Sequence, residues 1–356
     1  MDGQNLYTKI YDIDNLYKAS KNAMKGKKSK SYVAKFWMNE DREIAKIYKE
    51  LASQKYQFGN YKEFKINDNG VERKISAAPF RDRVVHHAIT NIIEPIFEKS
   101  FIYDSYANRK GKGTFKALQR AKMYAHRYNY VLKLDIKKYF PSIDFEILLT
   151  QIKKKIECEE TLNLLESLIK NSNKQDETNF YFKEDSLFTP FERERGLPLG
   201  NQTSQFFGNI YLNSFDHYAK EQLQIKGYIR YVDDMIFFDN SKEFLEDMII
   251  KIELFLTKLR VKIHPLKISL EETKLGFIFL GHKVFKTHFR LTSKGIRRGR
   301  RRLIKIKYLY KFSKLTTQEA KNKIFGTIGF FKLGNNYKIS EELLLQTVLV
   351  KSVQRQ

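Results

Sequence analysis

Three acidic residues stand where a carboxylate could do chemistry. Asp135 ends an apolar run at residues 131–134, and Asp233 and Asp234 form a pair between two further apolar runs. A charge in such a setting is costly to bury unless something compensates it. Taken singly, these residues could also cap a turn or form an ordinary polar hairpin turn. Together they make a hard-oxygen site suited to Mg²⁺, and two such ions can activate a hydroxyl and clamp a triphosphate.

A basic run near the end of the chain is the second candidate. Residues 294–307 contain eight Lys or Arg in fourteen positions. Such a run is usually a solvated face. The apolar residues within it predict instead a helix that is packed on one side and basic on the other, able to follow the phosphates of a duplex. These apolar residues are Ile296, Leu303, Ile304 and Ile306.

The overall charge is strongly positive. The chain has 356 residues, with 66 Lys or Arg against 41 Asp or Glu and a net charge of +25. Such a field attracts polyanions, among which nucleic acid is the obvious one. An anionic membrane surface is the alternative, although the sequence shows no anchor or membrane-length apolar run. The single cysteine, Cys158, excludes a Cys-based zinc cluster. We expect a cytoplasmic protein without a membrane partner.

Hydrophobic periodicity and turn signals predict the elements that must position these residues. Helices are expected at residues 32–51, 82–98, 145–171, 203–222 and 245–259, and over most of the chain after residue 292. Strands are expected at residues 62–75 (a hairpin turning at 67–70), 130–136, 228–238 (two strands about a tight turn) and 275–284. Their order is typical of an α+β fold of the split βαβ type.

Several blocks of sequence resemble, in the right order, the motifs of bacterial reverse transcriptases. Residues 133–144 resemble the first palm motif, 231–234 the YxDD box, 196–205 the motif between them, and 279–282 the primer grip. Residues 73–75, 79–83 and 106–111 are similar to the fingers motifs. The resemblance implies a right-hand polymerase. We expect a basic N-terminal arm at 1–31, fingers at 32–130, a ferredoxin-like palm at 131–290 with an excursion near 145–195, and a short basic helical thumb at 291–356.

The resemblance also implies roles for single residues. Asp135, Asp233 and Asp234 would be catalytic and would hold two Mg²⁺ ions, replaceable by Mn²⁺, with help from the Ile136 carbonyl. The residues implied in dNTP binding are Arg73, Arg109, Phe140 (as ribose gate), Leu199, Gly200, Gln205 and Lys267. Those implied in nucleic-acid binding are Arg297, Arg298, Arg300, Arg301, Arg302 and Lys305, with Leu280 and Gly281 in the primer grip. The plainer alternatives are a core ring for Phe140 and solvated or structural cations for Arg73, Arg109 and Lys267.

One block bears on the subfamily. Leu199-Gly200 and Ser204-Gln205 stand where most bacterial reverse transcriptases carry Gln-Gly and Ser-Pro, and this resembles the enzymes of diversity-generating retroelements. The resemblance implies error-prone copying at template adenines, a template RNA and cDNA strand, and a small basic oligomeric accessory protein. Two alternatives stay open: a group II intron-like or defence-associated reverse transcriptase, and a non-catalytic RNA-binding protein on a polymerase scaffold.

Overall fold

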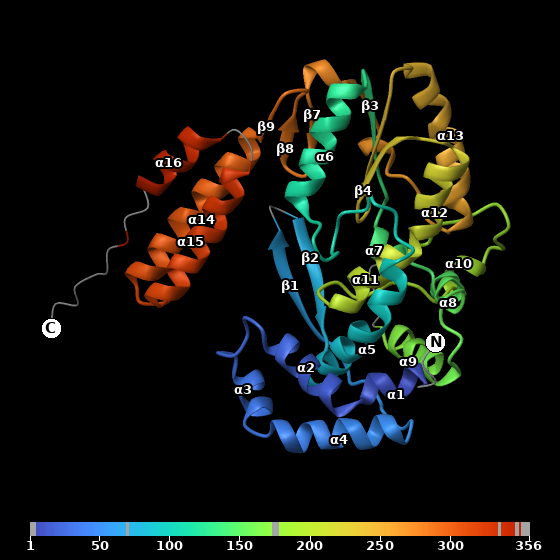
Figure 1. Cartoon of the computed structure of the whole chain (residues 1–356), viewed down its shortest axis with the longest axis vertical. Coiled ribbons are helices and arrows are strands. Elements are labelled where there is room, and N and C mark those ends of the chain that lie inside the picture. Colours follow the sequence, from blue (N-terminus) through green and yellow to red (C-terminus); the bar gives the residue numbers. More distant parts are fainter. Residues whose placement is uncertain (1–4, 69–70, 173–177, 334–335, 346–348, 350–356) are drawn as a thin grey trace.

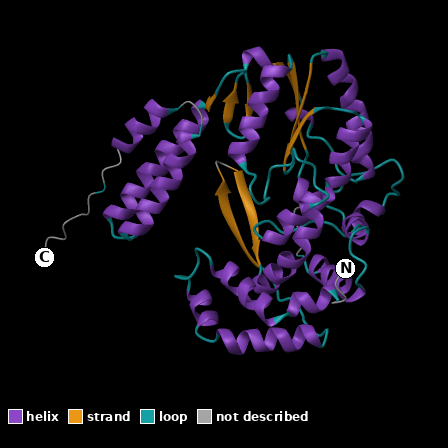
Figure 2. Ribbon diagram, viewed as in Figure 1, coloured by secondary structure: helices purple, strands orange, loops and turns teal. Residues whose placement is uncertain are grey.

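The computed structural model describes residues 5–68, 71–172, 178–333, 336–345 and 349. A helical layer at the N-terminal end, a central antiparallel sheet and a separate C-terminal helical bundle follow one another along the chain (Figure 1). The described chain contains both helices and antiparallel strands, as the ribbon in Figure 2 shows, so the predicted mixed α+β class is confirmed. None of the described helices is both long and apolar enough to cross a membrane.

The N-terminal layer is built on one long helix. Its helices are α1 (Leu6–Tyr11), α2 (Ile13–Met24), α3 (Ser31–Trp37), α4 (Glu40–Ala52) and α5 (Phe80–Glu98). Helix α2 packs on α5, where Leu16 and Ala19 are fully buried and the Asn15 side chain donates to the Ala88 carbonyl at 3.0 Å. The prediction of a basic arm over residues 1–31 was therefore wrong for α1 and α2, because their apolar faces complete the core around α5.

A two-stranded hairpin rises from this layer. Strands β1 (Lys62–Asp68) and β2 (Val71–Ala77) pair antiparallel, with Phe64 opposite Ile75 and Ile66 opposite Arg73. Cross-strand partners share one face of a hairpin, so these side chains lie together. The hairpin was predicted, but the central residues of its turn, 69–70, lie outside the described part of the chain.

The central sheet has four strands in the order β4-β5-β3-β6, all paired antiparallel. The strands are β3 (Tyr130–Asp135), β4 (Gly227–Tyr231), β5 (Asp234–Asp239) and β6 (Ser269–Glu272). Alternate residues face two cores. Leu132 and Leu134 join the large core under α13 (Lys242–Lys258), whereas Val131 joins a second core under α6 (Thr114–Arg127).

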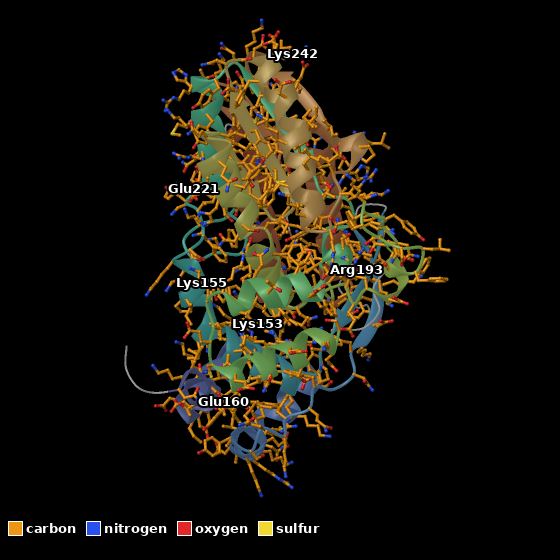
Figure 3. All side chains as sticks on the ribbon, turned by 90° about the vertical axis from the view of Figure 1, so that its right-hand side faces the viewer. Lys153, Lys155, Glu160, Arg193, Glu221 and Lys242 are labelled. Atoms are coloured by element: carbon orange, nitrogen blue, oxygen red, sulfur yellow. The ribbon has the colours of Figure 1, made fainter. Side chains whose placement is uncertain are left out.

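Short helices connect β3 to β4. They are α7 (Tyr139–Ser142), α8 (Phe145–Lys153), α9 (Glu159–Lys170), α10 (Thr189–Glu192), α11 (Gln202–Tyr211) and α12 (Asn213–His217), followed by a π-helical turn, Tyr218–Gln222. The helix predicted at 145–171 is broken between α8 and α9. The predicted excursion before residue 195 is anchored through Arg193, which pairs with Asp144 and Asp185. Figure 3 shows the face that carries Arg193, together with Lys153 and Lys155 near the end of α8.

The C-terminal part is a small sheet and a helical bundle with its own core. The elements are β7 (Phe277–Phe279), β8 (His282–Val284), β9 (Phe289–Leu291), α14 (Ser293–Lys311), α15 (Thr317–Lys332) and α16 (Tyr337–Leu345); 3₁₀ turns occupy Pro265–Lys267 and Thr273–Leu275. The single strand predicted at 275–284 was wrong, because Leu280 and Gly281 both have positive φ and make a tight turn between β7 and β8. Ile304, predicted on the packed side of the basic helix, is 66% exposed, and Tyr310 is buried there instead.

Candidate active site

The pairing of β3 with β5 positions two of the three acidic residues. Asp135, the last residue of β3, lies directly opposite Asp234, the first residue of β5. Residues directly opposite in an antiparallel pair project to the same face, so these carboxyl groups are neighbours. Asp233 precedes β5 in the turn from β4, next to Val232, whose φ is +59°. The turn therefore brings the acidic pair and Asp135 to one end of the sheet.

The electrostatics of this cluster follow from burial and like charge. The pKa of Asp233 is raised to about 6, first by burial and then by the Asp135 carboxylate, while Lys267 and Arg73 oppose the rise. The pKa of Asp234 is likewise raised to about 7, mainly by burial and also by the carboxylates of Asp135 and Asp233, while Lys133 opposes the rise. A bound cation would relieve this repulsion.

Lys267 supplies one positive charge to the site. Its ammonium lies 2.9 Å from both carboxylate oxygens of Asp135. Carboxylate oxygens are the ligands that Mg²⁺ prefers, so the donor set and its excess negative charge suit that ion. Across the described residues no three acidic, His or Cys side chains are already arranged as a metal cluster. Because the Lys267 ammonium contacts both oxygens of Asp135, a metal ion bound by this carboxylate would have to displace it.

The strand that carries Asp135 leads directly into an aromatic pair. Tyr139 and Phe140 follow on α7, and the Tyr139 hydroxyl donates to the Gly208 carbonyl of α11 at 2.5 Å. A β-carbon at Gly208 would lie 3.3 Å from the Tyr139 ring and 3.4 Å from the Phe140 ring, so both rings pack against α11 at this glycine. Phe140 is only partly buried. The Ile136 side chain is buried, and its main chain forms a bridge with Ile263.

The hairpin is fastened to the segment before α11. The Ser76 amide donates to the Leu199 carbonyl at 3.1 Å, and the Asn201 side chain donates to the Ser76 carbonyl at 2.9 Å. Gly200 has a φ of +105°, and a β-carbon there would come within 2.8 Å of Ile75. These contacts place the hairpin face that carries Arg73 toward the acidic cluster, in keeping with the influence of Arg73 on Asp233. Gln205, by contrast, is exposed on α11.

Arg109 has a different position from the one expected. Its guanidinium pairs with Glu98 at 2.7 Å and donates to the carbonyls of Ile102 and Ser105, and its side chain is only 6% exposed. These bonds hold the loop after α5 in place and leave the guanidinium directed into the protein. The prediction that Arg109 holds a triphosphate was therefore wrong for this structure.

The basic helix lines a cavity of about 760 Å³ together with the tip of the hairpin. Asn67 of β1 borders it on one side, and the other lining residues are Lys294, Arg297, Arg298, Arg301, Arg302 and Lys305 of α14. Arg300 is exposed but does not line this cavity. The Leu280-Gly281 turn lies at the start of the same helix, because the Gly281 carbonyl accepts from the Thr292 amide at 3.2 Å. We call the cavity lined by Asn67 and the six basic residues of α14 the basic cavity.

Sequence reasoning missed one residue that acts on the acidic cluster and one that holds the hairpin in place. Lys133 lowers the pKa of Asp234, and its position two residues before Asp135 on a strand was a usable signal for a shared face. Asn201 ties the hairpin to the segment before α11, and nothing in the sequence marked it for that task.

Comparisons with known proteins agree on one family. The reverse transcriptase (RNA-dependent DNA polymerase) family matches residues 63–284. Protein YkfC of Escherichia coli is 24% identical over 266 residues, which cover 62% of this chain and 65% of YkfC. The putative COX1/OXI3 intron 2 protein of Saccharomyces cerevisiae is 22% identical over 51% of this chain, and the match spans only 20% of the yeast protein.

A solved structure supports the fold. Telomerase from Candida tropicalis in complex with a fragment of telomeric RNA aligns with 82% of this chain and 54% of its own, with a TM-score of 0.51 and 12% identity. At that identity the likeness concerns the fold alone. The family match, in contrast, covers more than half of the chain and includes all three acidic residues described above. The chain therefore belongs to the reverse transcriptase (RNA-dependent DNA polymerase) family.

Proposed function

We propose that this protein is an RNA-directed DNA polymerase that copies a template RNA into cDNA from dNTPs. The observation that carries the proposal is the acidic cluster: Asp135 lies opposite Asp234, Asp233 stands in the adjoining turn, and burial with mutual repulsion raises the pKa values of both members of the pair. A divalent cation bound between these carboxylates would relieve their repulsion, which an ordinary surface turn would not need.

The residues of the cluster would hold two Mg²⁺ ions, for which Mn²⁺ could substitute. Asp135, Asp233 and Asp234 would be the ligands, with the Ile136 carbonyl assisting. When bound, the ions would activate the primer 3′-hydroxyl and neutralise the triphosphate and leaving pyrophosphate.

The surrounding residues would orient the incoming nucleotide. Arg73 would bind the triphosphate through its forked donors. The Phe140 ring would exclude a 2′-hydroxyl, while Leu199 and Gly200 would border the nascent base pair, with Gln205 on the same segment. Lys267, released from Asp135, would face the triphosphate.

The proposed polymerase has the right-hand architecture of fingers, palm and thumb. Fingers correspond to residues 32–130, supported by α1 and α2, the palm to 131–290 and the thumb to 291–356. The basic cavity would receive the backbone of the template–primer duplex between thumb and hairpin tip, since its guanidinium groups match phosphates. Leu280 and Gly281 would contact the primer strand beside it.

The direct test compares extension of a primed RNA template by wild type, Asp233→Asn and Asp247→Asn. Asp247 is an exposed carboxylate on α13 and serves as the matched control. We expect Asp233→Asn to lose more than about 100-fold in rate, because several kcal/mol of charge stabilisation disappear, and Asp247→Asn to extend normally. Extension by none of the three proteins would instead indicate a non-catalytic RNA-binding protein, and undiminished extension by Asp233→Asn would show that Asp233 is not a metal ligand of the reaction.

Within this function we propose a diversity-generating retroelement enzyme that is error-prone at template adenines. The support is the sequence Leu199-Gly200 with Ser204-Gln205, because an aliphatic side chain in place of Gln removes a polar restraint on the nascent pair. Such an enzyme would act with a small basic oligomeric accessory protein. Leu199→Gln should lower misincorporation opposite adenine, measured by sequencing the cDNA, and an unchanged error spectrum would count against this assignment.

A group II intron-like enzyme is the second candidate, favoured by the intron-encoded relative from yeast. The two candidates differ in the RNA that each would copy. Sequencing the RNA that co-purifies with the protein from its host, and the cDNA made from it, separates them: a template repeat with adenine-specific changes supports the retroelement, and an intron RNA copied faithfully supports the intron enzyme.

A further inference from the structure

A fully buried ion pair lies behind the turn that carries Asp233. Arg230 of β4 and Asp216 of α12 have no solvent exposure, and their side chains make two parallel bonds: Nε to Oδ1 at 2.7 Å and Nη2 to Oδ2 at 2.6 Å. The Tyr228 hydroxyl donates to Asp216 as well, at 2.8 Å. This fork holds the guanidinium in a single orientation.

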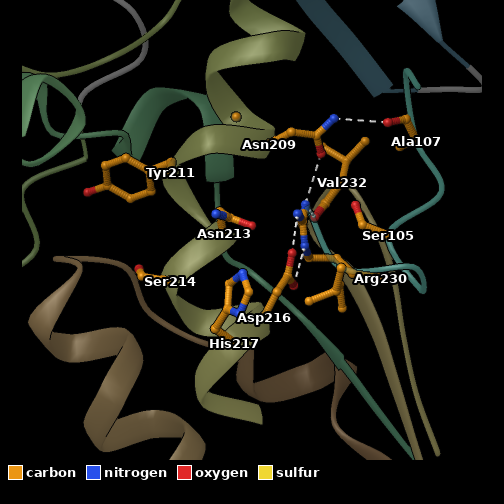
Figure 4. A network of polar contacts seen from close by, with 12 residues as sticks. Ser105, Ala107, Asn209, Tyr211, Asn213, Ser214, Asp216, His217, Arg230 and Val232 are labelled. Carbon is orange, nitrogen blue, oxygen red and sulfur yellow. Dashed lines mark hydrogen bonds and ion pairs between the residues drawn. The ribbon is translucent and has the colours of Figure 1, made fainter. Parts of the chain in front are cut away.

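The remaining nitrogen of Arg230 points at the turn itself. Its Nη1 donates to the Asn209 side-chain oxygen at 3.0 Å and to the Val232 carbonyl at 3.1 Å (Figure 4). Val232 is a β-branched residue in the left-handed region, with φ +59°, a conformation that is a genuine outlier for such a side chain. It persists only where the surroundings over-determine it, and the carbonyl that Arg230 binds belongs to the peptide leading into Asp233.

The same guanidinium connects the turn with other parts of the site. Asn209 belongs to α11, and its amide donates to the Ala107 carbonyl at 2.9 Å in the loop after α5 (Figure 4). The main chain of Arg230 also bonds this loop, donating to the Asp104 carbonyl and accepting from the Tyr106 amide, each at 3.0 Å. The buried guanidinium therefore contacts α11, α12 and the turn, and the loop is joined to them through Asn209 and the main chain of Arg230.

We propose that Arg230 is a positioning residue that holds the Val232 carbonyl, and through it the Asp233 carboxylate, in the orientation needed for metal binding. Asp216 and Asn209 fix the guanidinium that does so. A buried ion pair is weak evidence for stability, since apolar replacements of similar volume are often neutral or stabilising. Because Arg230 also bonds the Val232 carbonyl in the strained turn, we assign the pair a role in orienting Asp233. The inference rests on the proposed function of Asp233.

Two variants separate orientation from folding. Arg230→Lys keeps a positive charge beside Asp216. It loses the planar guanidinium, which alone can bond Asp216 and the Val232 carbonyl at the same time. The double variant Arg230→Met with Asp216→Leu replaces the pair with apolar side chains and leaves the Val232 carbonyl without its donor. The control is Arg120→Lys, which alters the Arg120–Asp104 pair beside the same strand without touching the turn.

The measurements are melting temperature, template–primer affinity, kcat, KM for dNTP, and Mn²⁺ binding to the nucleic-acid-free protein by electron paramagnetic resonance. We expect both Arg230 variants to melt near the control, keep their KM and nucleic-acid affinity, bind Mn²⁺ several-fold more weakly and lose up to about 100-fold in kcat. A purely structural role would lower the melting temperature without weakening Mn²⁺ binding, and that result would overturn the proposal.

The two proposals fail in different ways. If wild type does not copy RNA, the proposed function itself is wrong, and if Asp233→Asn copies RNA as wild type does, the proposed role of Asp233 on which the inference rests is wrong. If Asp233→Asn is inactive while either folded Arg230 variant keeps wild-type kcat and Mn²⁺ affinity, only the positioning role is refuted.

Discussion

The ammonium of Lys267 lies 2.9 Å from both carboxylate oxygens of Asp135, a residue 132 positions earlier in the chain. Lys267 reaches the sheet from the 3₁₀ turn before β6, and its side chain remains 53% exposed. An ammonium in this position places a positive charge where the proposed metal ligand would bind its ion. Lys267 and the proposed metal ion would therefore compete for the Asp135 carboxylate.

Removing the lysine should strengthen metal binding to the free protein. We expect Lys267→Met to raise Mn²⁺ affinity, but by no more than about fivefold, because an exposed ion pair contributes at most about 1 kcal/mol. Titration of Mn²⁺ by electron paramagnetic resonance measures this directly. Lys274→Met, which breaks the exposed pair with Glu272, is the control. Equal affinities in wild type and Lys267→Met would show that the two cations do not compete.

Gly200 should resist substitution for two reasons. Its φ of +105° strains any other residue, and an alanine β-carbon would lie 2.8 Å from Ile75 of the hairpin. We expect Gly200→Ala to destabilise the protein by roughly 1–3 kcal/mol and to raise KM for dNTP, since the hairpin that carries Arg73 must shift. Denaturant unfolding and steady-state kinetics measure the two effects.

The control for this substitution is Gly326→Ala on α15, where an added β-carbon meets no atom within 4 Å. An alanine in a helix should be neutral or slightly stabilising there. A Gly200→Ala enzyme that matched the Gly326→Ala enzyme in stability and KM would contradict the docking of the hairpin described above.

The basic cavity predicts a measurable salt dependence. Arg297→Gln and Arg301→Gln should each weaken template–primer binding and reduce the slope of log affinity against log salt by about one, as expected for the loss of one phosphate contact. Arg300→Gln, on the same helix but outside the cavity, should leave the slope unchanged. Fluorescence anisotropy between low and moderate salt measures all three. Identical slopes for the three variants would argue for diffuse attraction by net charge.

His86 predicts acid sensitivity of the fold. Burial lowers the pKa of His86 to about 3, with His87 and Arg83 adding to the shift. Below its usual pKa near 6.5 the unfolded chain binds a proton that the folded protein does not, so stability is lost as pH falls from about 6.5 toward 3. This contribution changes by about 1.4 kcal/mol per pH unit.

His86→Phe should therefore become more stable relative to wild type as the solution is acidified. Urea unfolding at several pH values compares the two proteins, and the exposed His126→Phe on α6 is the control. The difference between proteins isolates His86 from the raised pKa values of Asp233 and Asp234, which favour the folded state at lower pH. A pH-independent difference would show that the pKa of His86 is the same in the folded protein as in the unfolded chain.

Much of the local structure could be predicted because it depends on near neighbours. The alternation around residues 62–75 indicated the hairpin, and the apolar runs beside Asp135 and Asp233 indicated strands of the central sheet. Side-chain burial repeats every two residues in a strand and about every 3.6 in a helix, so each pattern is complete within a short segment. The order of these segments also indicated the mixed α+β class. The resemblance of the motif blocks indicated the reverse transcriptase family, which the match over residues 63–284 confirms.

Packing between distant segments decided the rest. Residues 1–31 looked like a basic arm because of the Lys-rich stretch from Lys21 to Lys30, yet the apolar faces of α1 and α2 complete the core on α5. Arg109 matched a motif, but the three-dimensional fold gives it Glu98 as its partner. The charge pairs of Arg230 with Asp216 and of Lys267 with Asp135 likewise form only when the sheet assembles.

By itself, the sequence determined which carboxylates and basic residues the chain contains and which strands and helices carry most of them. The tertiary structure alone decided the partners of each charge, because partners far apart in sequence meet only through the register of β3 with β5 and the packing of helices on the sheet. A pattern of residues records local burial, whereas the electrostatic environment of a buried group is set by everything that surrounds it.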